Sequence, residues 1–441
     1  MATPQIAAAE AYLGEVKDDE VDIQKLNFTQ FPAQGMTTTY AADRYITGSA
    51  ASATAMASGQ KTNIGVVGMD ASKTNSLKTI AEMAKEAGMK VGIVSSVDID
   101  HATPAAFYAH VPARGQYYEI GLQMANSGFD YFGGGRVRLS KTPEGKPTVL
   151  EVMEEKGWNL IENKKEFLSL EPSQSQVYAY NYGFASDALK YAIDREFDDI
   201  TLAEFTEKGI ELLDNPNGFF MMVEGDKIDW AGHANDAGAN IHDTIAFDNA
   251  VAKALDFYDR HPEETLIVVT GDHECGGLTL GFAGTSYKSA FKVLAKQKAS
   301  YEWFNEYVLG EYKENADPET AKLADLEDEI AEYFGLTNWS PRESKLLQDA
   351  FERTITGDKE RAGDEFTWLL YGYYEPLTVT ITHLLNERAG LAWTSYSHTG
   401  IPVPTFAKGA GQELFHGYYD NTDIFHKLIE ATNLNLAVAS K

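Results

Sequence analysis

The 441-residue chain has 37 Lys and Arg residues against 66 Asp and Glu residues, which gives a formal net charge of -29 at pH 7. This acidic balance argues against nucleic acid or an anionic membrane as the main partner, because both repel a negative surface. A single cysteine excludes an intrachain disulfide framework, and 44% hydrophobic residues indicate a globular protein with a full core.

The first quarter of the chain predicts helices and then a buried strand. Residues 2–13 favour a helix, and the small residues of 48–59 predict a helix that packs closely against its neighbours. Ser49 lies at the N-terminal end of that second helix, where serine is also a common N-cap. A helix over 77–87 followed by a strand over 90–97 is the alternation of a parallel sheet.

The rest of the chain continues this alternation, with one interruption. Apolar runs at 218–223 and 265–270 predict buried strands, and 236–259 predicts a long amphipathic helix between them. Residues 285–390 are rich in charged and aromatic side chains and favour helices, so we expect an insertion that forms a lid or an oligomer contact. A strand at 391–396 then resumes the sheet.

Polar clusters follow the predicted strands where open α/β sheets place their ligands. The clusters are Asp98, Asp100, His101 and Thr103; Glu224, Asp229 and His233; Asp272 and His273; and His398. Each cluster alone is also consistent with a hydrogen-bonded strand end. Together they predict a multinuclear metal site, because mixed histidine and carboxylate ligands suit zinc and oxygen ligands suit magnesium. Asp229 and His233 are four residues apart, so one helical turn would direct both at one ion.

Five runs, in order along the chain, resemble the motif set of the alkaline phosphatases. They are GSAASAT, ATPAAFYAH, VEGDKIDWAGHAND, TGDHECGG and SHTG. The resemblance implies a three-layer α/β/α fold with a mostly parallel central sheet and helices on both faces, in one domain over 1–441. It also implies a phosphomonoesterase with two zinc ions and one magnesium ion, acting on small phosphate monoesters, in a homodimer found in the periplasm or outside the cell. No leader opens the chain, so we expect that the signal of an exported form preceded residue 1.

Matching positions carry the family's roles to individual residues. Ser49 would be the phosphorylated nucleophile, and Arg114 would clamp two phosphate oxygens with its planar guanidinium group. The implied metal ligands are Asp229, His233 and His398 for the first zinc, Asp272, His273 and Ser49 for the second, and Glu224 and Thr103 for magnesium.

Several positions depart from the family's pattern. Gly48 replaces an aspartate that helps to orient the arginine, so we expect a looser Arg114. His101 and Trp230 replace an aspartate and a lysine beside the substrate. His101 would either admit zinc at the magnesium position or adjust the water shell of that ion, and Trp230 would weaken phosphate binding. Cys275 is expected to be a buried thiol rather than a ligand.

The family's first strand, which ends in Gly-Asp-Gly and supplies an aspartate to the second zinc and the magnesium, would lie just before Met1. Losing a central strand would leave a groove in the core, so we expect the strand to belong to a longer protein. Two other functions stay open: a phosphodiesterase or sulfatase relative on the same scaffold, and a catalytically impaired protein that binds metal or phosphate.

Overall fold

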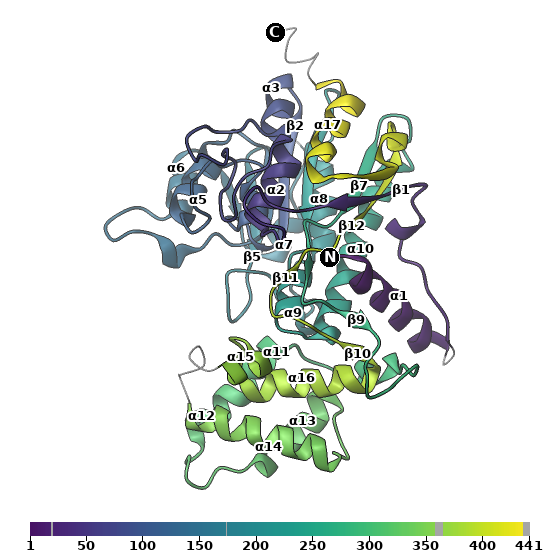
Figure 1. Cartoon of the computed structure of the whole chain (residues 1–441). Coiled ribbons are helices and arrows are strands. Elements are labelled where there is room, and N and C mark those ends of the chain that lie inside the picture. The colour runs from purple at the N-terminus through teal and green to yellow at the C-terminus, as the bar shows by residue number, and fades with distance from the viewer. Residues whose placement is uncertain (19–20, 173, 358–364, 435–441) are drawn as a thin grey trace.

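Two β-sheets form the centre of the computed structural model, which describes residues 1–18, 21–172, 174–357 and 365–434. One sheet has five strands in the order β4-β5-β3-β2-β6, and the other has four in the order β13-β1-β12-β7. Helices cover both sheets (Figure 1), so the predicted α/β class and helical layers are confirmed. The central sheet is divided into two parts, which agrees with the groove expected in the core where a central strand is absent.

The five-stranded sheet is entirely parallel. Its strands are β2 (Lys90–Asp98), β3 (Tyr131–Gly135), β4 (Asn159–Ile161), β5 (Val177–Asn181) and β6 (Phe219–Glu224). Neighbouring residues of β2 point to opposite faces: Ile93 joins one hydrophobic cluster and Val94 another. The first cluster includes α3 (Ile80–Ala87), α5 (Tyr117–Asn126) and α6 (Val149–Glu155), and the second includes α7 (Lys164–Leu168), α8 (Leu202–Leu213) and α10 (Ala237–Tyr258). Burial on both faces explains why these strands are continuous apolar runs.

The four-stranded sheet is mixed. It contains β1 (Ala33–Thr38), β7 (Leu266–Thr270), β12 (Val403–Gly409) and β13 (Gly417–Asp420). β12 runs antiparallel to β1 and β7, whereas β13 is parallel to β1. β1 and β13 were not predicted, because AQGMTT and GYYD lack a marked apolar run. Helix α17 (Asn421–Thr432) packs on this sheet through Leu428.

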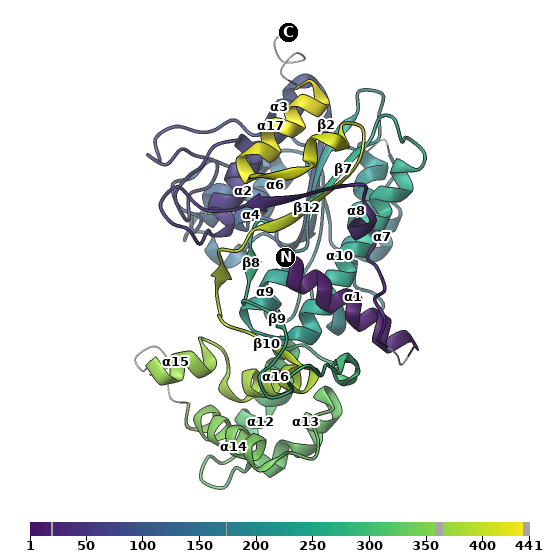
Figure 2. The same cartoon turned by 45° about the vertical axis from the view of Figure 1, so that its right-hand side comes forward.

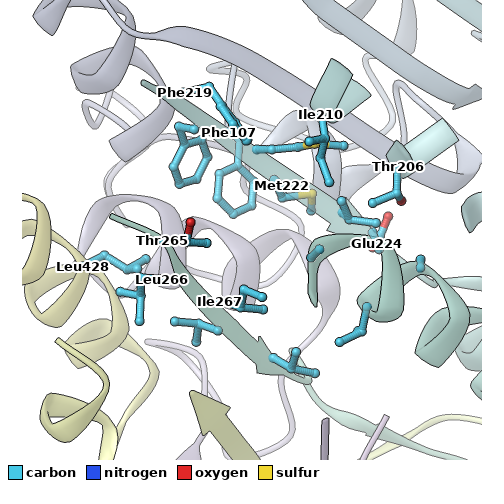
Figure 3. Close-up of a pocket in the computed structure, with 18 of the residues that line it drawn as sticks. Phe107, Thr206, Ile210, Phe219, Met222, Glu224, Thr265, Leu266, Ile267 and Leu428 are labelled. Carbon is cyan, nitrogen blue, oxygen red and sulfur yellow. The ribbon is translucent and has the colours of Figure 1, made fainter. Parts of the chain in front are cut away.

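A groove of about 1170 Å³ separates the two sheets between β6 and β7. Both strands were predicted to be buried, yet β6 is half-buried along its whole length and β7 is buried only at Val269. The reason is that, among the described residues, neither strand has a neighbouring strand on the side that faces the groove (Figure 3).

The helices between Phe291 and Ala389 lie together below the two sheets (Figure 1), as the turned view confirms (Figure 2). They are η4 (Phe291–Lys296), α11 (Tyr301–Trp303), η5 (Phe304–Leu309), α12 (Gly310–Asn315), η6 (Leu323–Leu326), α13 (Glu327–Phe334), α14 (Pro341–Thr356), α15 (Glu365–Tyr371) and α16 (Pro376–Ala389). Their apolar side chains share one hydrophobic cluster with α10 and with α1 (Thr3–Asp18), so the insertion is packed onto the α/β core. No helix among the described residues is both long and apolar enough to cross a membrane.

Short elements between the sheets and helices position the polar clusters. They are η1 (Phe28–Gln30), α2 (Ser49–Ser58), α4 (Ala102–Ala105), η2 (Leu139–Lys141), η3 (Ala192–Asp194), α9 (Lys227–His233), β8 (Glu274–Cys275), β9 (Thr279–Leu280), β10 (Leu391–Ala392), β11 (His398–Thr399) and η8 (Gln412–Phe415). The strand predicted at 391–396 shrinks to β10, which pairs with β9 outside both large sheets.

Candidate metal centre and nucleophile

Ser49 is the first residue of α2, and its hydroxyl faces the histidine cluster. The helix is made of small residues and is buried almost throughout, which holds its N-terminus firmly against the site. Gly48 is the N-cap, so the alternative reading of Ser49 as a capping residue is wrong. Ser49 Oγ lies 3.2 Å from Nε2 of His273. The first N–H groups of the helix lie beside this hydroxyl, where they favour an anion.

Asp229, His233 and His398 converge on one point. Helix α9 places Asp229 and His233 one turn apart, as predicted, and the pairing of β11 with β8 brings His398 opposite Cys275. The Nε2 atoms of the two histidines are 3.1 Å apart, and Asp229 Oδ2 is 3.4 Å from Nε2 of His233. His398 Nε2 lies 3.5 Å from Asp229 Oδ1. Ligands on a tetrahedral zinc ion lie about 3.4 Å from one another, so the spacing fits such an ion.

The hydrogen bonds of the two imidazole rings leave both Nε2 atoms free to bind metal. His233 Nδ1 lies 2.7 Å from the carbonyl oxygen of Tyr396, and His398 Nδ1 lies 2.9 Å from that of Thr47. A carbonyl can only accept, so each Nδ1 carries the hydrogen and each neutral ring presents a lone pair on Nε2. Two lone pairs this close repel each other unless a cation or a proton lies between them.

The surroundings of the two histidines shift their pKa values in opposite directions. Burial lowers the pKa of His233, but the adjacent Asp229 carboxylate outweighs it and raises that pKa to about 9. Burial and the neighbouring His273 lower the pKa of His398 to about 4. Burial would raise the pKa of Asp229, yet the surrounding histidines hold it well below its usual value. The pocket is therefore built around an anionic carboxylate that attracts positive charge.

Asp272 and His273 form a second group between Ser49 and Asp229. Asp272 Oδ2 lies 3.0 Å from His273 Nε2, and His273 Nδ1 lies 3.8 Å from Asp229 Oδ1. Asp272 Oδ2, His273 Nδ1 and Asp229 Oδ1 are nevertheless buried without a well-formed hydrogen bond. Burial opposes ionisation of Asp272, but His273 outweighs it and lowers the Asp272 pKa to about 2. Unpartnered buried polar atoms cost about 1–3 kcal/mol each, and bound ions would satisfy the two carboxylate oxygens.

Glu224 and Thr103 meet on the side of the site that faces the groove. Ser95 donates to Glu224 Oε2 at 2.5 Å, whereas Thr103 Oγ1 is buried beside this carboxylate without a well-formed hydrogen bond. Burial and the neighbouring Asp226 carboxylate raise the pKa of Glu224 well above its usual value. Oxygen donors alone suit magnesium, and a divalent ion would keep Glu224 charged.

Asp226 is a site residue that the sequence analysis missed. Its Oδ2 lies 3.0 Å from His101 Nδ1, and both atoms are buried without a well-formed hydrogen bond. Asp226 is 5% exposed and belongs to the same polar run as Glu224, so its position two residues later was the signal that could have found it.

Arg114 is oriented by His101. Its Nη2 lies 2.7 Å from Nε2 of His101, and because a guanidinium can only donate, that nitrogen accepts. The expected looseness of Arg114 next to Gly48 is thus offset by a histidine partner. Trp230 borders His101 edge-on, with ring centroids 6.1 Å apart. His101 and Trp230 therefore lie beside the arginine that was expected to hold phosphate.

Asp98 and Asp100 lie apart from the metal ligands. The Asp98 carboxylate binds the guanidinium of Arg138 at 2.7 and 3.0 Å, and Asp100 accepts from the Arg138 backbone N–H. Both carboxylates are therefore used to fix the loop after β3. Strand-end position alone could not distinguish them from His101 and Thr103.

Cys275 lies close to the first group of ligands. One donor atom from each of Asp229, His233, Cys275 and His398 lies within 4.8 Å of the others. Burial raises the pKa of the Cys275 thiol well above its usual value, which favours the neutral form. Cys275 is buried and unpaired, which confirms the expected buried thiol. A neutral thiol is a poor metal ligand, which supports the prediction that Cys275 does not bind the ions.

The sequence of this chain matches a known protein family and several of its members. The family model described as alkaline phosphatase matches residues 1–434. Alkaline phosphatase 3 of Bacillus subtilis is 30% identical over 98% of this chain and 87% of its own length. The repressible alkaline phosphatase of Saccharomyces cerevisiae is 26% identical over 91% of this chain and 74% of its own.

Solved structures of alkaline phosphatases also share the fold. The cold-active enzyme of a psychrophilic Shewanella is 31% identical, with a TM-score of 0.80 over 98% of this chain and 96% of its own. The Thermus thermophilus enzyme is 25% identical, with a TM-score of 0.77 over 98% of this chain and 89% of its own. A variant of the TAB5 enzyme, 25% identical with a TM-score of 0.64 over 98% of this chain and 95% of its own, has aspartate in place of a histidine and Mg bound in its M3 site.

Proposed function

We propose, from the premise that this chain belongs to the alkaline phosphatase family, that it hydrolyses phosphate monoesters through a phosphoserine intermediate on Ser49. Metal-dependent phosphomonoester hydrolysis is the family's activity and the activity of this enzyme. The observation that carries the mechanism is the position of the Ser49 hydroxyl, 3.2 Å from His273 and at the start of a buried helix.

Three groups of side chains would hold the ions. Asp229, His233 and His398 would hold one zinc, Asp272 and His273 a second zinc, and Glu224 and Thr103 a magnesium or zinc ion. Two such ions activate the attacking oxygen and stabilise the leaving oxygen in an in-line displacement. The buried oxygens of Thr103, Asp229 and Asp272 that lack a well-formed hydrogen bond are atoms that the ions would satisfy.

Ser49 performs the covalent step. Its Oγ gives its proton to solvent and forms a bond to phosphorus as the ester P–O bond breaks, and the alcohol leaves with a proton from solvent. Water then attacks the same phosphorus, the Oγ–P bond breaks, and inorganic phosphate leaves while Ser49 regains its proton. The N–H groups at the start of α2 stabilise the negative oxygens in both steps.

Arg114 positions the phosphoryl group. Its fork can donate to two phosphate oxygens while Nη2 stays against His101, so the histidine limits the rotation of the arginine. A chain of net charge -29 repels a dianion at long range, and the cationic arginine and the ions invert the charge locally. The fork alone does not separate these substrates, since diesters and sulfate esters also offer two free oxygens; membership of the alkaline phosphatase family favours monoesters.

The remaining expectations about this enzyme are also proposals. It would act as a homodimer in the periplasm or outside the cell, with the insertion serving as a lid or as part of the dimer contact. Its insertion and α10 share one hydrophobic cluster, which supports a fixed position for that segment.

Replacement of the nucleophile tests the mechanism. We expect Ser49→Ala to lower the release of nitrophenol from its phosphate monoester by roughly 10³-fold or more, while the zinc at Asp229, His233 and His398 is retained. Ser58→Ala, at the other end of the same helix, is the matched control and should leave turnover within a factor of two or so. Equal turnover by Ser49→Ala and the parent enzyme would refute the mechanism. Equal turnover of a phosphodiester by the parent enzyme would instead favour the diesterase alternative.

A further inference from the structure

Helix α9, which carries Asp229 and His233, lies between the sheets and the helical insertion (Figure 1 and Figure 2). These two residues are two of the three that would hold the first zinc. The helix has only 7 residues, which is too short to be stable in isolation, so its direction depends on what its two ends contact. Polar side chains of the insertion contact both ends.

The N-terminal end of α9 is held by an ion pair with the insertion. Lys227, the first residue of the helix, is fully buried, and its Nζ lies 3.2 Å from Oε2 of Glu302 in α11. The ammonium group also lies over the ring of Tyr191, 3.6 Å from the ring centroid. A buried cation is costly unless it is paired, so Glu302 fixes the place where α9 begins.

The C-terminal end of α9 is held by Asn235, which lies in the turn between α9 and α10. Its φ is 52°, in the left-handed region that residues other than glycine rarely adopt. Its side-chain nitrogen donates to the carbonyl oxygens of Gly232 at 2.8 Å and Ser395 at 2.9 Å. Because both partners can only accept, the orientation of the amide is fixed and Oδ1 faces the insertion.

Helix α16 of the insertion supplies two further partners of Asn235. His383 Nε2 lies 3.0 Å from Asn235 Oδ1, and Asn386 Nδ2 donates to the Asn235 carbonyl oxygen at 2.7 Å. An amide oxygen can only accept, so His383 is the donor and carries its hydrogen on Nε2. Burial lowers the pKa of His383 to about 4, which keeps the ring neutral. The insertion thereby stabilises the left-handed turn that follows α9.

These contacts lead to the zinc ligand His233 through one short segment. Asn235 donates to the carbonyl oxygen of Ser395. The next residue, Tyr396, accepts from Nδ1 of His233 at 2.7 Å through its own carbonyl oxygen. The ring of Tyr396 also stacks on His383, with ring centroids 5.9 Å apart. His383 therefore contacts both Asn235 and Tyr396, which fix the end of α9 and the imidazole ring of its histidine.

We propose that the insertion positions the first zinc group, with Glu302 and His383 as its positioning residues. They hold the two ends of α9, so that Asp229 and His233 point toward His398 before an ion binds. This inference rests on the proposed zinc ligands and goes beyond them, because neither Glu302 nor His383 is among those ligands. The hydrophobic cluster with α1 and α10 fixes the place of the insertion, whereas the polar contacts fix the direction of α9.

The zinc affinity of the metal-free protein, measured by competition with a chelator, tests the proposal. His383→Phe keeps an aromatic ring beside Tyr396 but removes the donor to Asn235. Glu302→Gln keeps the shape of the side chain but removes the charge opposite Lys227. We expect each variant to weaken zinc binding at the first site by roughly tenfold, since groups that orient metal ligands have effects of this size.

Thr378→Val is the matched control. It removes a buried hydrogen bond between α16 and Asn305 that lies within the insertion, and zinc affinity should stay within about twofold of the parent value. His383→Gln should regain most of the affinity lost in His383→Phe, because its amide nitrogen can replace Nε2 as the donor to Asn235. Circular dichroism checks that each metal-free variant is folded, and Glu302→Gln carries the test if His383→Phe is not.

The possible outcomes separate the proposal from the function on which it rests. Unchanged zinc affinity in both His383→Phe and Glu302→Gln would overturn the proposal. An equal loss in Thr378→Val would also overturn it, because the insertion would then act only through its own stability. Zinc binding by the parent that His233→Ala leaves intact would refute the first zinc group itself and this inference with it. All variants are made in a Ser49→Ala background, so their outcome is independent of the phosphoserine mechanism.

Discussion

The two sides of the metal centre differ in how completely the chain builds them. On one side, Asp229, His233 and His398 come from a short helix and a strand pair, and backbone carbonyls fix both imidazole rings. On the other side, Glu224 and Asp272 extend from the ends of β6 and β7, which border the groove. The first side is held by its own hydrogen bonds, whereas the second depends on two strands that share no neighbouring strand in the part of the chain that the structure describes.

The spacing of metal ligands in the sequence and the firmness with which the fold holds them are therefore separate properties. A four-residue spacing on a helix fixes two ligands locally, so it survives changes elsewhere in the sheet. Ligands at the ends of two separate strands are held only as well as those strands are held to each other. We therefore expect the first zinc to bind more tightly than the ion beside Glu224.

The largest loss of turnover is expected from a change in the first zinc group, Asp229, His233 and His398. His233→Ala removes one of three zinc ligands and should lower turnover by roughly 10³-fold, with the loss of about one zinc per chain. His416→Ala, at an exposed position, is the control and should change neither quantity. If His233→Ala retained full zinc content and turnover, the first cluster would not be the main metal site.

Zinc binding to the metal-free protein should depend steeply on pH. The pKa of His233 is raised to about 9 by Asp229 despite burial, so its ring must lose a proton before Nε2 can bind metal. Zinc affinity should therefore rise by about tenfold per pH unit from pH 6 to about 9 and then level off. Calorimetry in buffers of different ionisation enthalpy should show the released proton, and His233→Ala should remove it. A flat affinity over this range would contradict the proton assignment.

Asp226 offers a smaller test on the groove side. Asp226→Asn keeps the shape of the side chain but removes a charge 3.0 Å from His101 and close to Glu224. We expect the magnesium concentration for half-maximal activation to rise by roughly fivefold, with zinc content unchanged. Asp214→Asn, a carboxylate on the groove far from the ions, is the control. A change in zinc rather than magnesium binding would show that Asp226 acts on a zinc site and not on the ion beside Glu224.

Trp230→Lys should have the smallest effect. A lysine at this position would add a cation beside His101 and tighten phosphate inhibition by about threefold. Measurement of the inhibition constant for phosphate tests this prediction, with Trp230→Phe as the uncharged control. If lysine failed to tighten inhibition, the tryptophan would not explain weak product binding.

Much of the fold followed from local pattern. The helical spacing of Asp229 and His233, the small residues of α2 and the apolar run of β6 each determine a local structure, and the structure confirms all three. The unpredicted strands β1 and β13 form through partners distant in sequence, such as Ala33 opposite Ala407. No local pattern identifies a strand whose partner lies more than 300 residues away.

The site was predictable to a similar degree. Motif positions placed Ser49 next to His273, and the structure brings them within 3.2 Å. The roles of Asp98 and Asp226 were not predictable, because both are acidic residues near strand ends. Asp98 binds Arg138, while Asp226 faces His101, and only the three-dimensional position of each partner decides between these uses.

The most direct test of the central claim is the stereochemistry of phosphoryl transfer to an acceptor alcohol from a phosphate monoester made chiral with oxygen isotopes. Two in-line displacements, first onto Ser49 and then onto the acceptor, each invert the phosphorus, so the account predicts overall retention. Peptide mapping after an acid quench should find the phosphoryl group on Ser49. Overall inversion, with no phosphate on Ser49, would show a single direct displacement and contradict the account.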